Sequence, residues 1–159
     1  MSRHVTRALA SLAILSIAIL PAGCVGRYRA ARVTTLEVRL VAEGESGTEA
    51  RRFFGEEVLR VESEVLLDAT LVREAQLESF PDDTRHIVLY FDEPGRARLT
   101  AITREHAGRR LAFLVDGRIV IAPSIRAEIA DGVAHLTVAP GQDIEAVFDA
   151  LTRPATPQP

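Results

Sequence analysis

Histidine, serine and carboxylate side chains are the groups in this sequence whose chemistry allows catalysis or metal binding. The histidines beyond the N-terminal segment, His86, His106 and His135, fall in three different predicted elements and lack a metal-ligand spacing such as HxxxH. Zinc also favours cysteine thiolates, and the single cysteine lies far from all three in the sequence. We therefore expect no metal site.

A nucleophilic triad can be drawn from Ser124, Asp116 and His135. However, the GxSxG elbow that would expose such a serine is missing, and a serine hydroxyl in this setting more often caps a backbone turn. The acidic pairs Glu56–Glu57 and Asp82–Asp83 do not lie in apolar stretches that would raise a carboxyl pKa for acid–base work. We expect no catalytic residues and no cofactor, and hence a protein that is not an enzyme.

The N-terminus has the three parts of a secretory signal. Arg3 and Arg7 give a positive start, Ala8–Leu20 is an uncharged apolar run, and Pro21–Gly23 supplies small or turn-forming residues before Cys24. As a helix, the apolar run would span roughly 20 Å, whereas the hydrocarbon core of a bilayer is about 30 Å thick. This length favours a cleaved signal over the alternative, a retained transmembrane anchor.

Cys24 is the only cysteine, so a disulfide within one chain is impossible. The segment before it resembles a bacterial lipobox, in which the cysteine is lipidated and becomes the new N-terminus. That family usually has leucine three residues before the cysteine, whereas Pro21 stands there and Leu20 is one position further back. Ordinary cleavage that leaves a free thiol is the alternative. We predict a lipoprotein-type signal peptide over residues 1–23 and lipidation at Cys24.

Lipidation would anchor the chain in the cell envelope, facing the periplasm or the cell exterior. Val25 is not an acidic retention residue, which by resemblance to lipoprotein sorting favours the outer membrane. The chain has 19 Lys and Arg against 22 Asp and Glu, a net charge of −3. This balance argues against nucleic acid as a partner and against electrostatic docking on anionic lipid.

The chain is long enough for one folded domain after the signal is removed. We expect a polar tether over residues 24–33, a domain over 34–153 and a proline-rich disordered tail over 154–159. Period-two alternation of apolar and polar residues predicts the strands of this domain. They are expected at Thr35–Val41, Glu57–Val65, His86–Asp92 and Ala134–Val138.

A hairpin is predicted where Asp116-Gly117 separates the apolar runs Leu111–Val115 and Arg118–Ile121. Both central residues of such a turn need a positive φ, which aspartate tolerates and glycine adopts without steric cost. Pro123 is expected to end the second strand because it cannot donate to a sheet ladder.

Cap residues and helical spacing predict the helices. Asp92 is placed as the N-cap of a helix that runs to about Ala107, and Gln142–Leu151 has the apolar spacing of an amphipathic helix. Shorter helical segments are considered at 68–77, capped by Asp68, and at 124–129. Together these elements predict an α+β fold, with an antiparallel, hairpin-rich sheet and helices packed on one of its faces.

The stretch Phe91–Leu151 resembles one family, the head part of the first periplasmic domain of SecD in the SecDF protein-export translocase. The matching residues occur in order and with matching gaps: Phe91-Asp92, Gly95, Leu99, Thr103–Glu105, Gly108–Ala112, Asp116-Gly117, Ala122–Ile125 and Ile129–Gly132. Two positions depart from the family pattern. Asp131 replaces one glycine of the usual Gly-Gly turn, and Ala139–Gln142 replaces Gly-x-Phe-Thr.

The resemblance implies a domain that contacts emerging polypeptide, or a partner, outside the cytoplasmic membrane. It marks as turns and possible binding surface the residues Asp116, Gly117, Pro123, Ile125 and Gly132. After Cys24 no run approaches the ~18 apolar residues of a membrane helix, so we expect that the proton-driven coupling of the translocase is absent.

Two functions are therefore expected from the sequence. The first is an envelope lipoprotein that contacts exported or unfolded polypeptide as an accessory of protein export. The alternative is a structural or assembly lipoprotein that binds one envelope protein partner. For a polypeptide ligand, the candidate surfaces are an exposed strand edge and an apolar groove beside Ile121–Ile129.

Overall fold

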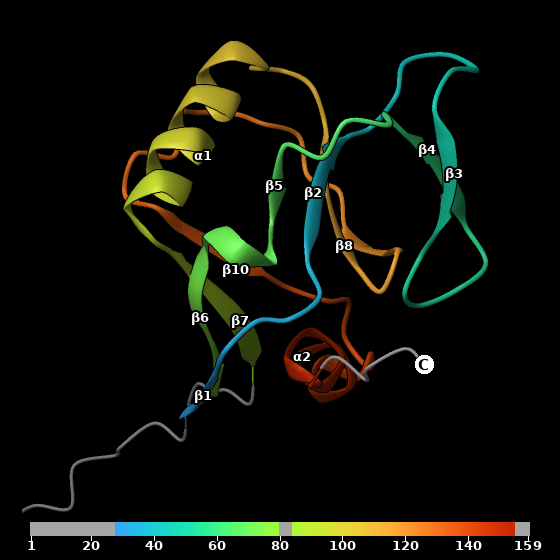
Figure 1. Cartoon of the computed structure of the whole chain (residues 1–159). Coiled ribbons are helices and arrows are strands. Elements are labelled where there is room, and N and C mark those ends of the chain that lie inside the picture. Colours follow the sequence, from blue (N-terminus) through green and yellow to red (C-terminus); the bar gives the residue numbers. More distant parts are fainter. Residues whose placement is uncertain (1–27, 80–83, 155–159) are drawn as a thin grey trace, which may run out of the picture.

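The computed structural model describes residues 28–79 and 84–154, which form an α+β fold with mostly antiparallel sheets (Figure 1). The predicted signal peptide, Cys24 and residues 155–159 of the predicted tail lie outside the described residues. No helix in the described part combines the length and apolar character needed to cross a membrane. The predicted α+β class with antiparallel pairing is confirmed, but the strands form three sheets instead of one.

The first sheet has the strand order β1-β6-β7-β10, and all its pairs are antiparallel. Its strands are β1 (Tyr28–Ala31), β6 (Val72–Ser79), β7 (Arg85–Phe91) and β10 (Val133–Leu136). The strands predicted at His86–Asp92 and Ala134–Val138 are confirmed as β7 and β10, each shifted by one or two residues.

β1 corrects the prediction of a polar tether over residues 24–33. Its backbone pairs with β6 from Tyr28 opposite Glu78 to Ala31 opposite Ala75. Apolar alternation does not reveal this strand in the sequence, because the face that carries the partly buried Ala31 also carries the charged and exposed Arg29. The guanidinium of Arg29 lies 5.0 Å from the Phe148 ring centroid and pairs with Asp149, so the charge is held at the surface while the strand packs.

β6 corrects the helix considered at 68–77. The Asp68 cap is confirmed, since its carboxylate accepts a hydrogen bond from the Thr70 amide, but the helical part is one 3₁₀ turn, η1 (Ala69–Leu71). The chain then continues as an eight-residue strand that has β1 on one side and β7 on the other. Pairing on both sides and burial of Ala75 and Leu77 at period two override the helical spacing.

The second sheet has the order β5-β2-β8-β9. Its strands are β5 (Leu67–Asp68), β2 (Glu37–Leu40), β8 (Leu111–Val115) and β9 (Arg118–Ile121). The predicted hairpin is confirmed with its bounds, and Asp116 and Gly117 have the positive φ values of 49° and 70° that its turn requires.

A third, two-stranded sheet joins β3 (Thr48–Arg51) to β4 (Val58–Val61). β4 lies within the strand region predicted at Glu57–Val65, whereas β3 was not predicted because its sequence TEAR lacks apolar alternation. Ala50 and Val61 of this hairpin pack on the face of the second sheet that points away from the main core.

Both main helices begin at predicted caps or spacings. The Asp92 carboxylate accepts a hydrogen bond of 2.8 Å from the Gly95 amide at the start of α1 (Glu93–Glu105). The C-terminal helix is α2 (Ile144–Thr152), capped by Asp143. The helix considered at 124–129 is wrong, because none of these residues is helical, and Ser124 and Ile125 pair instead with residues 108–110 through backbone hydrogen bonds.

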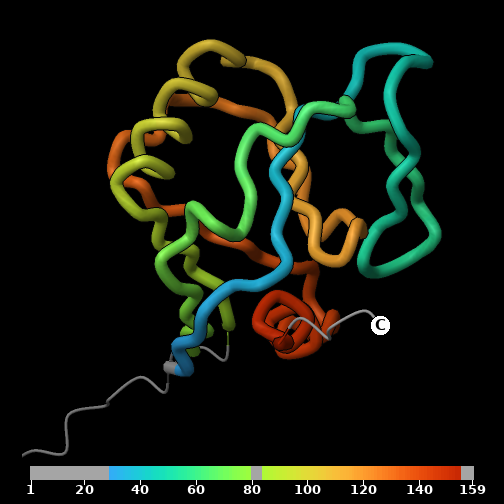
Figure 2. Tube along the Cα trace, in the orientation of Figure 1, coloured from blue at the N-terminus to red at the C-terminus, as the bar shows by residue number. Residues whose placement is uncertain are grey.

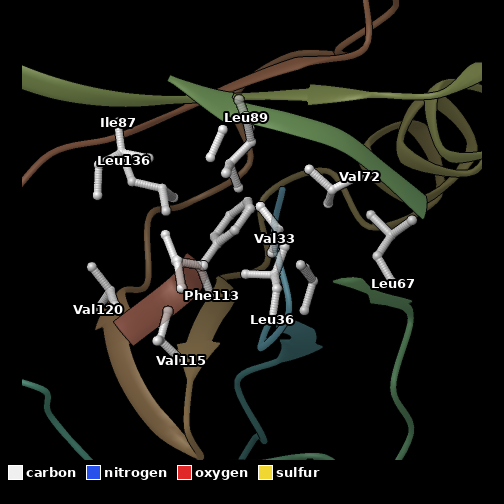
Figure 3. Close-up of a cluster of buried hydrophobic side chains, with 14 of the residues drawn as sticks. Val33, Leu36, Leu67, Val72, Ile87, Leu89, Phe113, Val115, Val120 and Leu136 are labelled. Carbon is white, nitrogen blue, oxygen red and sulfur yellow. The ribbon is translucent and has the colours of Figure 1, made fainter. Parts of the chain in front are cut away.

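The main core lies between the inner faces of the first two sheets (Figure 3). Ile87, Leu89 and Leu136 of the first sheet point toward Phe113 and Val115 of the second. Helix α2 closes one side of this core and contributes Phe148 and Leu151, which are fully buried. In Figure 2, α2 lies close to the start of the described chain, whereas α1 covers the opposite part of the molecule.

Candidate polypeptide-binding groove

The loop that joins β10 to α2 separates two surface hollows. The first, which we call the groove, has a volume of about 290 Å³ and is lined by Arg52, Phe54, Glu57, Val120, Ile121, Thr137, Val138, Ala139 and Gln142. The second, the end hollow, has a volume of about 720 Å³ and is lined by residues 84–86 and 137–145. Because residues 137–139 and 142 line both, a ligand in either hollow would contact this loop.

The floor of the groove is apolar. Phe54, Ile121 and Val138 are each partly exposed and pack against the main core with the rest of their surface. The backbone of Phe53 positions the first of these, since its amide donates to the Ile119 carbonyl at 2.8 Å and so joins the β3–β4 loop to β9. The Phe53 and Phe54 rings meet edge to face, with centroids 5.0 Å apart.

The rim of the groove is charged. Arg52 pairs with Glu57 through Nε and Oε2 at 3.0 Å, and its side chain is 23% exposed. Arg118 does not line the groove but supports the loop behind it, since it donates to the Phe53 carbonyl at 2.8 Å and places its guanidinium 5.1 Å from the Phe53 ring centroid. An apolar floor with a few polar groups at its edge suits an extended peptide with apolar side chains.

An unpaired strand edge leads into the same region. Among the strands of residues 28–79 and 84–154, β10 has β7 as its one neighbour in the first sheet, so the other side of β10 is an edge of the described sheet. The strand ends at Leu136, directly before Thr137 and Val138 of the loop. The two surfaces considered from the sequence, a strand edge and an apolar groove, therefore meet at the end of β10.

The groove covers only part of the surface predicted beside Ile121–Ile129. Ile121 lines it, whereas Ile125 is 7% exposed and belongs to the core. Two lining elements were missed from the sequence, namely Phe54 and the loop 137–142. The aromatic pair Phe53-Phe54 inside the polar stretch RRFFGEE was the available signal for the first.

The five family-motif residues do not gather in one site. Asp116 and Gly117 line a separate hollow of about 410 Å³, together with residues 34–37 and 68–70. Pro123 is exposed, and its carbonyl accepts a hydrogen bond of 2.9 Å from the Leu111 amide. Asp116 and Gly117 form the turn of the β8–β9 hairpin, Pro123 follows β9, and Ile125 belongs to the core.

The backbone conformation and surroundings of Gly132 explain why this position holds glycine. Its φ is +72°, and a Cβ at this position would lie 2.7 Å from Cγ of Arg96 on α1. The Gly132 carbonyl also accepts a hydrogen bond of 3.0 Å from the Phe91 amide. The position therefore combines a left-handed backbone with close approach to a helix side chain.

The β8–β9 hairpin does not bring Asp116 and Ser124 together as a catalytic triad would require. Asp116 precedes β9 and Ser124 follows it, so the length of this strand separates them. His135 lies on β10, where its ring meets that of His86 edge to face at 6.4 Å between centroids. Within residues 28–79 and 84–154, no group of three or more His, Cys, Asp or Glu residues is arranged to hold a metal ion.

Comparison with known families links this architecture to protein export. The family model of the SecDF P1 head subdomain matches residues 39–144. A solved structure of SecDF, described as a membrane component that enhances protein export, is 21% identical and superposes with a TM-score of 0.60. SecDF in a super-membrane-facing form is also 21% identical, with a TM-score of 0.61.

A third structure, SecDF from Thermus thermophilus described as a translocon-associated membrane protein, is 26% identical with a TM-score of 0.51. The alignments cover 77%, 77% and 79% of this chain but 62%, 18% and 19% of the three SecDF chains, in the same order. The chain thus spans less than two thirds of each of these structures. No curated protein matches the sequence.

Proposed function

Because the chain belongs to the SecDF P1 head subdomain family, we propose that it is a non-enzymatic accessory of protein export that binds extended segments of exported or unfolded polypeptide. Lipid on Cys24 would hold it in the cell envelope, on the side that faces the periplasm or the exterior. The proposal includes neither a cofactor nor nucleic acid.

The groove beside loop 137–142 carries this proposal. Its partly exposed floor residues Phe54, Ile121 and Val138 can take up apolar side chains, and each methylene removed from water contributes about 0.8 kcal/mol. The adjoining edge of β10 can hydrogen-bond the backbone of an extended segment, independently of its sequence. Backbone hydrogen bonds and one small apolar hollow would bind segments of many different sequences, each with low affinity.

Binding of a permanently unfolded protein tests the proposal. The probe is reduced, carboxymethylated lactalbumin with a fluorescent label, and the readout is fluorescence anisotropy. We expect Val138→Ser to weaken binding about fivefold, because it removes about 1 kcal/mol of apolar contact. The matched control is Val58→Ser on β4, which removes a valine that is 40% exposed and does not line the groove.

Equal affinity of the wild-type chain and the Val138→Ser variant, with unchanged thermal unfolding, would contradict the groove as the binding surface. Binding of the probe lost equally in the Val58→Ser control would contradict it too. If the chain does not bind the unfolded probe but co-purifies with one folded envelope protein in a fixed stoichiometry, the result would support the alternative, a structural or assembly lipoprotein.

A further inference from the structure

We propose that the end of the first sheet where β1 begins faces the bilayer, so that the end hollow opens toward the lipid headgroups. This inference rests on the proposed lipidation of Cys24 and assigns a membrane-facing surface to the domain. The occupant of this surface is the lipid headgroup layer of the membrane that holds the anchor.

The length of chain between anchor and domain carries the first step. Cys24 precedes Tyr28 by four positions, and Tyr28 already pairs with Glu78 on β6. A fully extended chain spans at most about 3.6 Å per residue, so the first residue of β1 lies within about 14 Å of the lipidated cysteine. The start of β1 therefore stays within about this distance of the membrane surface.

The sheet register then shows which residues share that end. Glu78 of β6 faces Tyr28 on one side and His86 of β7 on the other, and Ile87 faces Leu136, the last residue of β10. Adjacent strands lie about 4.8 Å apart, so the whole row across four strands is about 14 Å wide. The start of β7 and the end of β10 border the end hollow.

Most carboxylates at this end have partners within the domain. Arg29 pairs with Asp149 and Arg85 pairs with Glu145. Asp143, which lines the end hollow, accepts hydrogen bonds from the backbone amides of Glu145 and Ala146. These bonds reduce the repulsion that the carboxylates would otherwise meet at anionic lipid. β1 and α2, which carry Arg29 and Asp149, lie together in the lower part of Figure 1.

A fluorophore at either end of β6 tests the orientation. The wild-type chain has one cysteine, so Ser79→Cys and Arg73→Cys can be labelled selectively once Cys24 carries lipid. The two positions lie about 20 Å apart along the strand. The full lipidated chain is reconstituted in phosphatidylethanolamine and phosphatidylglycerol vesicles that contain a headgroup-nitroxide lipid, which quenches only at short range. We expect several-fold stronger quenching at position 79 than at position 73.

The control inserts twenty Gly and Ser residues between Arg27 and Tyr28, which adds about 25 Å of root-mean-square reach. In this variant the difference between the two labels should disappear. Equal quenching in the unmodified lipidated chain, or stronger quenching at position 73, would overturn the orientation alone. An intact mass that shows no lipid on Cys24 would overturn the anchor and the orientation together, while leaving polypeptide binding by the groove intact.

Discussion

At the scale of single residues, the family motif of this chain serves conformation. Gly132 is the sharpest example, because its left-handed backbone lies against Arg96 of α1. Asp116 and Gly117 make the turn of the β8–β9 hairpin, and Ile125 fills the core. The family-motif residues of this chain therefore each have a separate structural role. The residues that line the groove lie at other positions.

We predict that Gly132→Ala lowers the free energy of unfolding by about 2–4 kcal/mol. The left-handed φ costs about 1–2 kcal/mol for a residue with a Cβ, and the approach to Arg96 at 2.7 Å adds to it. Gly141→Ala is the matched control, because Gly141 has a φ of +83° but no atom within 4 Å of the added Cβ. Equal losses in the two variants, measured by urea unfolding, would refute the contact with Arg96.

Asp68 gives the chain a predictable response to acid. Hydrogen bonds from the Thr70 hydroxyl and amide hold the pKa of the Asp68 carboxyl below its usual 3.8. A carboxyl whose pKa is depressed in the folded state adds stability above its unfolded pKa and loses it as the pH falls through the folded value. The charged form of Asp68 therefore stabilises the fold at neutral pH.

We predict that Asp68→Asn destabilises the chain at pH 7 by less than about 1 kcal/mol, because asparagine remains a good cap. The difference from the wild type should shrink as the pH falls below about 4 and vanish once Asp68 is protonated in both states. Urea unfolding from pH 7 to pH 2.5 measures it. A difference that stays constant over this range would contradict a depressed pKa.

At the scale of elements, Thr103 joins α1 to the segment that precedes β10. Its hydroxyl is buried, donates to the Leu99 carbonyl at 2.8 Å and accepts from the Ile129 amide at 2.9 Å. We predict that Thr103→Val lowers the free energy of unfolding by about 1–3 kcal/mol, since the buried Thr103 hydroxyl is lost and the partly buried Ile129 amide loses its partner.

Thr152→Val is the control for Thr103. The Thr152 hydroxyl also donates back along its own helix, to the Phe148 carbonyl at 2.8 Å, but it is only partly buried. Chemical unfolding of the two variants should show a clearly smaller loss for Thr152→Val. Equal losses would mean that the amide of Ile129 does not depend on Thr103.

Local signals were enough to predict the elements whose structure is decided locally. The β8–β9 hairpin follows from Asp116-Gly117 between apolar runs, and α1 follows from the cap at Asp92. β1, β3 and β6 were not predicted because their pairing partners decide them. β1 is polar, β3 packs a single alanine, and β6 shows helical spacing that its two neighbouring strands override.

The groove was only partly predictable for the same reason. From the sequence, a candidate apolar groove is expected beside Ile121–Ile129, and of the two ends of this range Ile121 lines the groove. Phe54 and Val138 come from segments distant in the sequence, and only the packing of the β3–β4 loop on β9 brings them together. Sites formed between sheets depend on long-range contacts that a single sequence does not display.

At the scale of the whole molecule, the head-like fold is combined in our proposal with a lipid anchor at Cys24. The proposed polypeptide-binding groove and the proposed membrane-facing end share the loop 137–142, so a segment bound in the groove would lie close to the bilayer. A short tether of this kind would favour capture of polypeptide as it emerges from the membrane over capture in free solution.

Site-specific photo-cross-linking in cells tests this account most directly. A photoreactive residue replaces Val138 in the groove or, as the control, Val58 on β4, in the full chain, while a defined secretory protein is arrested midway through export. The account predicts cross-links to the arrested protein from position 138 and none above background from position 58. Equal cross-linking from both positions, or none from position 138, would contradict it.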